Sequence, residues 1–350
     1  MNIDEKYLFR CIELGKKGLG TTAPNPMVGC VIVHNDKIIG EGFTSPFGGP
    51  HAEVNAINSV KNKLLLPQAT LYVTLEPCSH YGKTPPCADY IIKHAIPKIV
   101  IGLKDPHTKV AGKGIERLRA SSCDVKVGVL SKECRELHKR FLTFQEKKRP
   151  YIILKWAETL NGFIAPEPSK RGENPKPFWI TNTYSRQLVH QWRSEEQAIL
   201  VGTNTVLLDN PKLDVRDWAG TNPMRVVLDA RLRIPQNFHV MDESVDTLVL
   251  HDSKINGNHK RGIRYLAIDY TSRIAPQICQ VLYEHQITSV LIEGGKQTLE
   301  SFITANLWDE ARIFTGASSF KNGTSAPKIS GRVDSTKTII QDTLTVLKND

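Results

Sequence analysis

One stretch of the chain, residues 77–87, reads PCSHYGKTPPC and places a cysteine near each end of a polar loop. An apolar run at 70–75 comes before this loop and predicts a buried strand, whereas residues 88–94 after it have the spacing of a helix. Further upstream, the tripeptide HAE at 51–53 opens another segment with helical spacing. The order of helix, strand, loop and helix predicts an α/β domain.

The two motifs together contain the side chains of a metal centre. His51, Cys78 and Cys87 offer one imidazole and two thiolates, which are ligand types that zinc prefers. Three protein ligands leave the fourth tetrahedral position open, which is typical of a catalytic zinc site. Glu53 adds a carboxylate that is not a ligand and can carry a proton from the zinc-bound water to a leaving amine. These four residues predict a zinc-dependent deaminase with Glu53 as its catalytic residue.

The spacing within each motif is compatible with such a centre. Residues two apart on a regular helix point in different directions, so His51 and Glu53 converge only if the helix begins at His51, directly after Gly49-Pro50. Pro85-Pro86 likewise predicts that Cys87 opens the next helix, where the helix dipole stabilises a thiolate. Either motif alone is equally compatible with buried core residues, and it is their combination that favours zinc.

The alternation of strands and helices continues through the first part of the chain. We expect strands at 28–33, 38–42, 70–75, 98–102 and 124–129, and helices at 4–17, 88–94, 114–120 and 131–144. A further helix follows Gly49-Pro50 and runs through Val54, Ile57 and Val60. The charged segment EKKRP at 146–150 ends this series. Because domain boundaries fall in polar, proline-containing linkers, we expect a first domain at residues 1–147 and a second at 148–350.

The second domain has the same alternating pattern, so both domains are predicted to be α/β. We expect strands at 151–156, 198–202, 225–228, 247–250, 289–293 and 310–314, and helices at 182–193, 274–285 and 296–305. A polar, proline-rich stretch at 166–177 interrupts the series after its first strand. Residues beyond about 315 show no pattern from which we predict an element.

Composition places the chain among ordinary folded proteins. It has 350 residues, of which 40% are hydrophobic and 23% charged. Its apolar runs are far below the roughly 20 residues of a membrane span, and Asp4 and Glu5 precede any apolar run, which argues against a secretory signal. The seven cysteines are odd in number and scattered, which argues against a disulfide framework. We therefore expect a cytoplasmic protein without a membrane partner.

The net charge of +10 is unevenly distributed, since residues 1–147 contain 21 Lys and Arg against 14 Asp and Glu. This excess is compatible with a nucleic-acid ligand, a phosphorylated metabolite or a solvated basic surface. The sequence has no basic strip interleaved with aromatic residues, so we expect no nucleic-acid partner. A nucleic-acid or nucleoside zinc deaminase with an appended binding domain is the competing hypothesis, and a non-enzymatic metal-dependent binding protein is a third.

The motifs NPMVG at 25–29, HAE at 51–53 and PCSHYGKTPPC at 77–87 closely resemble the deaminase half of the bifunctional deaminase-reductases of riboflavin biosynthesis. Nucleic-acid and cytidine deaminases typically carry a shorter Cys-x2-Cys spacing. The resemblance implies a cytidine-deaminase-like domain that holds one zinc ion and removes the 2-amino group of a diamino-hydroxy-phosphoribosylaminopyrimidine. It also implies that Asn25 binds this substrate, although from the residues alone Asn25 can equally be a turn residue before Pro26.

Residues from about 151 onward resemble the reductase half of the same family, whose domain is similar to dihydrofolate reductase. The shared motifs include KWA at 155–157, WIT at 179–181, AILVG at 198–202, DNPKLDVR at 209–216 and EGG at 293–295. The resemblance implies NADPH-dependent reduction of the substrate's ribosyl unit to a ribityl chain. It assigns NADPH contacts to Ala157, Trp179, Thr205, Asp209 and Gly295, and substrate contacts to Arg193, Leu213, Arg216 and Glu293.

Elementary chemistry supports part of this assignment. A glycine pair between a strand and a helix lets a phosphate approach free backbone N–H groups, and an arginine fork binds a phosphate bidentately. The residues alone also allow surface or helix-end arginines and a core position for Trp179. Asn161, Phe163 and Pro177 depart from the family's pattern and alter the expected local substrate contacts. The motifs are compatible with a monomer and with a homo-oligomer.

Overall fold

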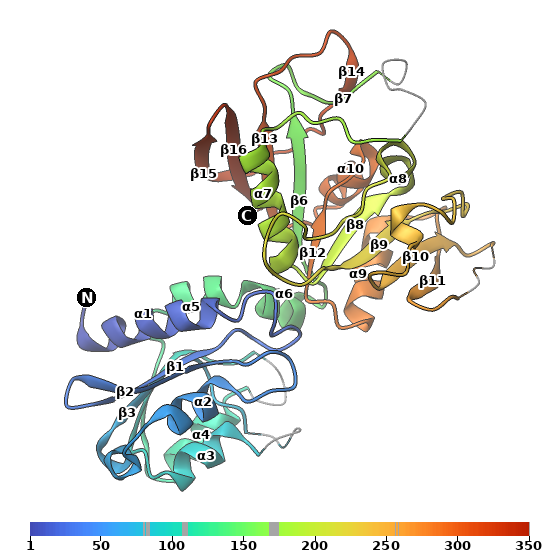
Figure 1. Ribbon diagram of the computed structural model, residues 1–350. Coiled ribbons are helices and arrows are strands. Elements are labelled where there is room, and N and C mark those ends of the chain that lie inside the picture. The colour runs from blue at the N-terminus through green and yellow to red at the C-terminus, as the bar shows by residue number, and fades with distance from the viewer. Residues whose placement is uncertain are drawn as a thin grey trace. The chain divides into compact units, whose positions relative to one another are not determined.

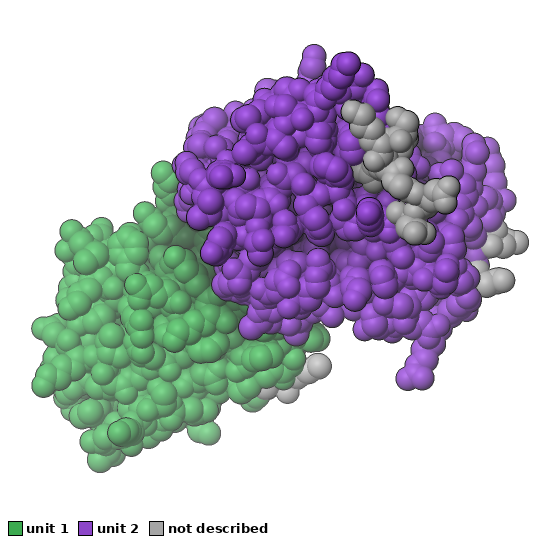
Figure 2. Space-filling view, turned by 45° about the horizontal axis from the view of Figure 1, so that its top comes forward, with its two compact units in different colours: residues 1–148 green, residues 149–350 purple. Residues whose placement is uncertain are grey.

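The computed structural model of the chain describes residues 1–79, 81, 85–106, 111–167, 175–255, 257 and 259–349. They form two compact units, Met1–Lys148 and Arg149–Asp350, which Figure 2 shows in different colours. None of the helices in the described part of the chain has both the length and the apolar character needed to cross a lipid bilayer.

Unit 1 is built around a five-stranded sheet with the strand order β2-β1-β3-β4-β5. Its strands are β1 (Gly29–His34), β2 (Lys37–Phe43), β3 (Thr70–Leu75), β4 (Lys98–Leu103) and β5 (Asp124–Val127). Its helices are α1 (Ile3–Lys16), α2 (Ala52–Ser59), the short 3₁₀ helix η1 (Lys63–Gln68), α3 (Cys87–Lys93), α4 (Lys113–Ala120), α5 (Ser131–Leu137) and α6 (Lys139–Lys147). Strand β1 is antiparallel to β2 and β3, whereas β3, β4 and β5 are parallel.

Both faces of this sheet are covered by helices, with α1 and α5 on one face and α2, α3 and α4 on the other (Figure 1). Strand β1 contributes side chains to the hydrophobic clusters on both faces of the sheet, because successive side chains of a strand point to opposite faces. Cys30 and Ile32 pack into the cluster that includes α2 and α3, while Val31 and Val33 pack against α1. This explains why β1 is apolar at nearly every position rather than at alternate ones.

The strand directions bring three loops of unit 1 to a single edge of the sheet. Because β1 runs against β2 and β3, its beginning lies beside their ends, with Gly29 opposite Phe43 and Cys30 opposite Val73. The segment before β1, the segment between β2 and α2 and the loop after β3 therefore all start or end at this edge. These segments contain Asn25, the HAE motif and Cys78.

Unit 2 contains a nine-stranded sheet with the order β11-β10-β9-β8-β12-β6-β13-β16-β15. Its strands are β6 (Tyr151–Glu158), β8 (Ala198–Gly202), β9 (Met224–Leu228), β10 (Thr247–Asp252), β11 (Ile263–Ile268), β12 (Ser289–Ile292), β13 (Glu310–Thr315), β15 (Arg332–Ile339) and β16 (Asp342–Lys348). Only the β13–β16 and β15–β16 pairs of this sheet are antiparallel in the described residues. Two further short strands, β7 (Phe163–Pro166) and β14 (Gly323–Ser325), pair with each other.

The helices of unit 2 cover both sheet faces, as the core clusters and Figure 1 show. They are α7 (Thr183–Glu195), α8 (Thr203–Asp209), α9 (Ile274–Glu284), α10 (Lys296–Thr304) and the 3₁₀ helix η3 (His239–Met241). From β8 the chain continues outward to β9, whereas from the adjacent β12 it continues past β6 to β13. Neighbouring parallel strands with connections in opposite directions create a crevice at their carboxyl ends, which is where open α/β sheets bind ligands.

The structure confirms the predicted α/β class and most predicted elements, but the single helix expected at 131–144 is wrong. The chain instead forms α5 and α6, with His138 between them in a non-helical conformation (φ −92°, ψ 9°). Nε2 of the buried His138 lies 3.1 Å from Oγ1 of Thr74. This contact with β3 depends on the fold and leaves no trace in local periodicity.

The sequence also failed to predict η1, α8, β7, β11 and the strands that follow residue 315. Strand β15 is mostly exposed and lacks the alternation that marks a half-buried strand. Of the proline-rich stretch expected at 166–177, residues 168–174 lie outside the described part of the chain.

A buried ion pair fixes the beginning of unit 2. Both guanidinium NH groups of Arg149 bond to Asp309, at 2.5 and 2.8 Å, and the same carboxylate accepts the N–H of Ile152 at 2.9 Å. Each side chain is only 9% exposed. Removing either Arg149 or Asp309 would leave the charge of the other unpaired in a low-dielectric environment.

We predict that Asp309→Ala lowers the free energy of unfolding of unit 2 by about 3–5 kcal/mol, because it leaves Arg149 buried without its partner. Urea unfolding followed by tryptophan fluorescence measures this directly, since all five tryptophans lie after residue 150. The control is Asp334→Ala, which removes an exposed pair with Arg332 and should change stability by less than about 0.5 kcal/mol. Equal effects of the two substitutions would contradict the role given to the buried pair.

Candidate functional site

The sequence-predicted zinc ligands come together in unit 1. Nδ1 of His51 lies 3.7 Å from Sγ of Cys78 and 3.3 Å from Sγ of Cys87, and the three ligand atoms all lie within 4.8 Å of one another. With zinc–sulfur and zinc–nitrogen bonds of about 2.3 and 2.1 Å and tetrahedral angles, a nitrogen and a sulfur ligand should be about 3.6 Å apart. The distances and the donor types therefore fit a zinc ion with one position left for water.

Local backbone structure explains how these side chains converge. His51 is the residue before the first turn of α2, and its extended conformation (φ −75°, ψ 166°) turns its side chain away from the helix axis. Cys87 is the first residue of α3, directly after Pro86. Its N–H donates to Sγ of Cys78 at 3.3 Å, and the next N–H, that of Ala88, donates to the carbonyl of Cys78 at 3.1 Å. Both helix starts were predicted from the sequence and are confirmed.

The electrostatics of the site favour proton exchange near neutrality. Glu53, the second residue of α2, is 3% exposed, and burial, together with the nearby Cys78 thiolate, raises its pKa to about 7. Hydrogen bonds from Cys87 and His51 lower the pKa of Cys78 to about 4. The hydrogen bond between His51 and Cys78 is also the main factor that raises the pKa of His51, to about 8. A buried carboxylate whose pKa is raised takes up a proton more readily than an exposed one, which suits a group that carries a proton.

Asn25 lies in the segment before β1, at the same sheet edge as the zinc ligands. Its N–H donates to the carbonyl of Thr22 at 2.9 Å, so its backbone does form a turn. Within the described residues, no hydrogen bond involves its half-buried side-chain amide. His80 and residues 82–84 of the cysteine loop lie outside the described part of the chain.

A second cluster of charges surrounds Glu293 at the carboxyl end of β12. Arg193, in the last turns of α7, binds both carboxylate oxygens of Glu293, at 2.7 and 2.8 Å. Nζ of Lys155, on β6, lies 3.4 Å from the same carboxylate. Burial alone would raise the pKa of Glu293, but Arg193 and Lys155 lower it to about 2, whereas burial lowers the pKa of Lys155. The carboxylate is therefore ionised and held in place by two cations.

The structure brings the predicted substrate residues Arg193 and Glu293 into direct contact, and it adds Lys155, whose role the sequence analysis missed. A lysine within an otherwise buried apolar strand was the available signal. Arg193 also donates to the carbonyl of Asp214 at 3.1 Å, and the Asp214 side chain accepts a 2.8 Å hydrogen bond from Arg216. Asp214 thus connects Arg193 to the half-exposed Arg216.

Small residues line the crevice between β8 and β12. A Cβ atom placed on Gly294 would lie 2.9 Å from Oγ1 of Thr205, and one on Gly295 would lie 3.3 Å from the same atom. Gly295 has φ +74° and directly precedes α10, and with no side chain it provides no capping hydrogen bond to the first N–H groups of this helix. The two glycines thus make room for Thr205 beside the start of α10. A strand–glycine–helix connection at such a switch point is where open α/β sheets bind a dinucleotide phosphate.

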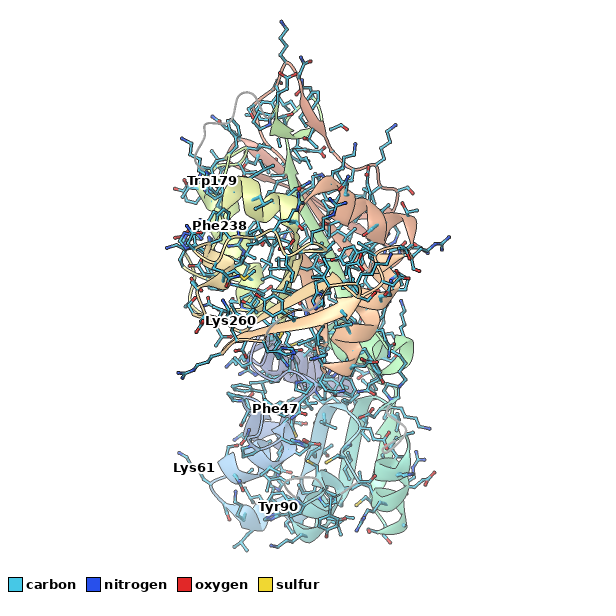
Figure 3. The ribbon with its side chains drawn as sticks, turned by 90° about the vertical axis from the view of Figure 1, so that its right-hand side faces the viewer. Phe47, Lys61, Tyr90, Trp179, Phe238 and Lys260 are labelled. Carbon is cyan, nitrogen blue, oxygen red and sulfur yellow. The ribbon has the colours of Figure 1, made fainter. Side chains whose placement is uncertain are left out.

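The remaining predicted contact residues lie on different elements and differ in exposure. Asp209 is the last residue of α8, and Ala157 pairs with Phe314 across β6 and β13. Trp179 is 53% exposed and lies 4.7 Å from the guanidinium of Arg186, so its interpretation as a core residue is wrong (Figure 3). Leu213 is only 2% exposed, and its side chain packs into the hydrophobic core next to α8 rather than facing solvent.

Comparison with known proteins matches both units. A family model described as the RibD C-terminal domain matches residues 150–343, and one described as the cytidine and deoxycytidylate deaminase zinc-binding region matches residues 1–103. The chain is 39% identical over 335 residues to the riboflavin biosynthesis protein RibD of Aquifex aeolicus, covering 94% of this chain and 88% of that protein. It is 34% identical over 327 residues to RibD of Escherichia coli, covering 89% and 87%.

Solved structures agree over nearly the full length. A diaminohydroxyphosphoribosylaminopyrimidine deaminase/5-amino-6-(5-phosphoribosylamino)uracil reductase from Thermotoga maritima is 38% identical, with a TM-score of 0.88 and 99% of each chain covered. RibD from Acinetobacter baumannii is 31% identical, with a TM-score of 0.87 and the same coverage.

We predict that Cys87→Ser reduces bound zinc from about one equivalent per chain to well below half, because it replaces a thiolate with a weak ligand. Metal analysis after dialysis against a mild chelator measures the loss. Cys123→Ser is the matched control, since the thiol of Cys123 donates to the carbonyl of Ile96, at 3.6 Å, and belongs to no ligand set. The zinc content of this variant should be unchanged. Full zinc retention in Cys87→Ser would contradict the assigned ligand set.

Proposed function

The chain belongs to the RibD family of bifunctional riboflavin-biosynthesis enzymes, and on this basis we propose which of its residues carry each reaction. The enzyme is a zinc-dependent deaminase and an NADPH-dependent reductase that acts on a pyrimidine intermediate. Our proposal assigns deamination to residues 1–147 and reduction to residues 148–350. The main support for this division is that the chain contains two clusters of functional side chains, one around His51 and Glu53 and one around Glu293.

Deamination replaces a carbon–nitrogen bond of the pyrimidine with a carbon–oxygen bond and releases ammonia. His51, Cys78 and Cys87 would hold the zinc ion, which would supply a water with a lowered pKa. The Glu53 carboxylate accepts a proton as the water oxygen bonds to carbon, and it then protonates the departing amine. Asn25 orients the ring from the same edge of the sheet, since its amide can both donate and accept hydrogen bonds. Burial of Glu53 excludes bulk water from this transfer.

Reduction adds a hydride to the ribosyl carbon that bears the amine and a proton to the ring oxygen that leaves that carbon. NADPH bound to unit 2 would supply this hydride. In our proposal the crevice formed by Thr205, Gly294 and Gly295 binds its phosphates, and the exposed Trp179, together with Ala157 and Asp209, contacts the rest of the cofactor. The ionised Glu293 bonds to sugar hydroxyls, and Nζ of Lys155 holds the proton for the ring oxygen.

The substrate phosphate requires a cation that is exposed enough to exchange its carboxylate partner for the phosphate. Arg193 is bound bidentately by Glu293, so its first role is to position that carboxylate. Arg216 is 40% exposed, and its guanidinium can exchange Asp214 for a phosphate. Leu213 supports the backbone of this loop from the core side. The departures at Asn161, Phe163 and Pro177 lie in other segments and leave this charge arrangement intact.

The proposed cellular location is the cytoplasm. All seven cysteines are free thiols, and two of them are zinc ligands that must stay reduced. A reducing compartment preserves such thiolates.

Glu53→Gln should keep zinc and fold but slow ammonia release by about 100-fold or more, because an amide cannot carry the proton. A coupled ammonia assay at saturating substrate measures kcat. Reduction of the already deaminated intermediate serves as the control within the same molecule and should be unchanged. If more than half of the deaminase activity remained, another group would have to be the proton carrier.

Arg216→Ala should raise the KM of reduction with little change in kcat, because a phosphate contact made in both the ground and transition states contributes uniform binding. NADPH oxidation, followed by absorbance, separates the two constants. Deamination by the same variant should proceed at the normal rate. Loss of both activities in a well-folded Arg216→Ala protein would point to one shared site instead of two.

A further inference from the structure

Glu76 is a buried carboxylate in unit 1 that the proposed reaction steps do not use. It directly follows β3, stands two residues before the zinc ligand Cys78 and is 4% exposed. Its two oxygens accept hydrogen bonds of 2.9–3.2 Å from four backbone N–H groups, those of Asp105, Gly112, Gly114 and Ile115. A carboxylate has about four acceptor positions, so these four hydrogen bonds occupy the acceptor positions of Glu76.

Two of these bonds replace the missing cap of α4. The residue before this helix is Gly112, which has no side chain and adopts a left-handed conformation with φ +94°. Glu76 instead accepts the N–H groups of the second and third helical residues, Gly114 and Ile115. A negative charge at a helix N-terminus is also stabilised by the helix dipole. A residue about 40 positions away along the chain thus performs the capping.

The same contact brings α4 against the backbone that carries Cys78. A Cβ atom on Gly114 would lie 2.1 Å from the carbonyl oxygen of Pro77, so only glycine allows this approach. The N–H of Glu76 also donates to the carbonyl of Leu103, at the end of β4, at 2.9 Å. The residues immediately before Cys78 are therefore fixed to β4 and α4 on one side.

On the other side, Cys78 is fixed by α3. Its carbonyl accepts the N–H of Ala88, and its Sγ accepts the N–H of Cys87. These bonds orient Cys78 relative to Cys87 but leave the preceding backbone to be held by Glu76. A metal site is sensitive to such second contacts, because zinc requires its ligand atoms to be close to tetrahedral positions.

We propose that Glu76 is a positioning residue of the deaminase site: by capping α4 it fixes the backbone of Pro77 and Cys78 and thereby the direction of the Cys78 thiolate toward zinc. This inference rests on the proposed zinc centre but concerns zinc affinity and ligand geometry, which are measurable without substrate. Zinc content of the unaltered enzyme tests the centre itself, so failure of one claim is distinguishable from failure of the other.

Glu76→Gln is the direct test, because its amide NH₂ would face backbone N–H groups that need acceptors. We expect zinc affinity, measured by competition with a chromophoric chelator, to fall about tenfold or more. The cobalt-substituted variant should also show altered absorption bands. The stability control is Val125→Ala, a core truncation in β5, which should destabilise unit 1 but keep zinc affinity within about twofold of the unaltered enzyme.

A measurement on the unaltered enzyme covers the case in which Glu76→Gln does not fold. Coupling between two sites is reciprocal, so adding zinc to the metal-free enzyme should slow amide hydrogen exchange at Gly112, Gly114 and Ile115. The amide of Val249, in the core of unit 2, should not respond. The proposal would be overturned if a folded Glu76→Gln protein kept the zinc affinity and the cobalt spectrum of the unaltered enzyme. It would also be overturned if the exchange rates of the three amides were the same with and without zinc.

Discussion

Zinc coordination is the constraint on which the structure of unit 1 depends. Three ligand atoms from separate segments must lie within 4.8 Å of one another, and each must approach from its own tetrahedral direction. The antiparallel pairing of β1 with β2 and β3 brings the necessary loops to one sheet edge. The starts of α2 and α3 then orient His51 and Cys87, so secondary structure and metal geometry support each other.

In unit 2, ion pairs between charged side chains hold the residues of the second cluster in place. Burying Glu293 alone would cost several kcal/mol, and the cost is offset only because Arg193 and Lys155 remain beside it. These three side chains come from β6, α7 and the end of β12, which fixes them relative to the crevice between β8 and β12. The ion pairs hold the three side chains in one arrangement, which reduces the reorganisation that a reaction requires.

The sequence predicted most reliably the features whose cause is local. Strand 70–75 is apolar throughout, and the prolines before Cys87 and the Gly-Pro before His51 marked helix starts, so the zinc ligands could be predicted together. Contacts between distant segments could not: Arg193 and Glu293 are 100 residues apart, and the contact of His138 with Thr74 that accompanies the helix break has no local signature. The resemblance assigns Leu213 a substrate contact, and the burial of its side chain follows from a core that only the folded chain defines.

X-ray absorption at the zinc edge of the unaltered enzyme counts and identifies the ligand atoms, and it therefore tests directly whether His51, Cys78 and Cys87 form an open zinc site. We expect two sulfur neighbours at about 2.3 Å, from Cys78 and Cys87, and two nitrogen or oxygen neighbours at about 2.0–2.1 Å, from His51 and a water. A shell with three or more sulfurs, or with none, would contradict the open, three-ligand site from which the deaminase chemistry of this chain is derived.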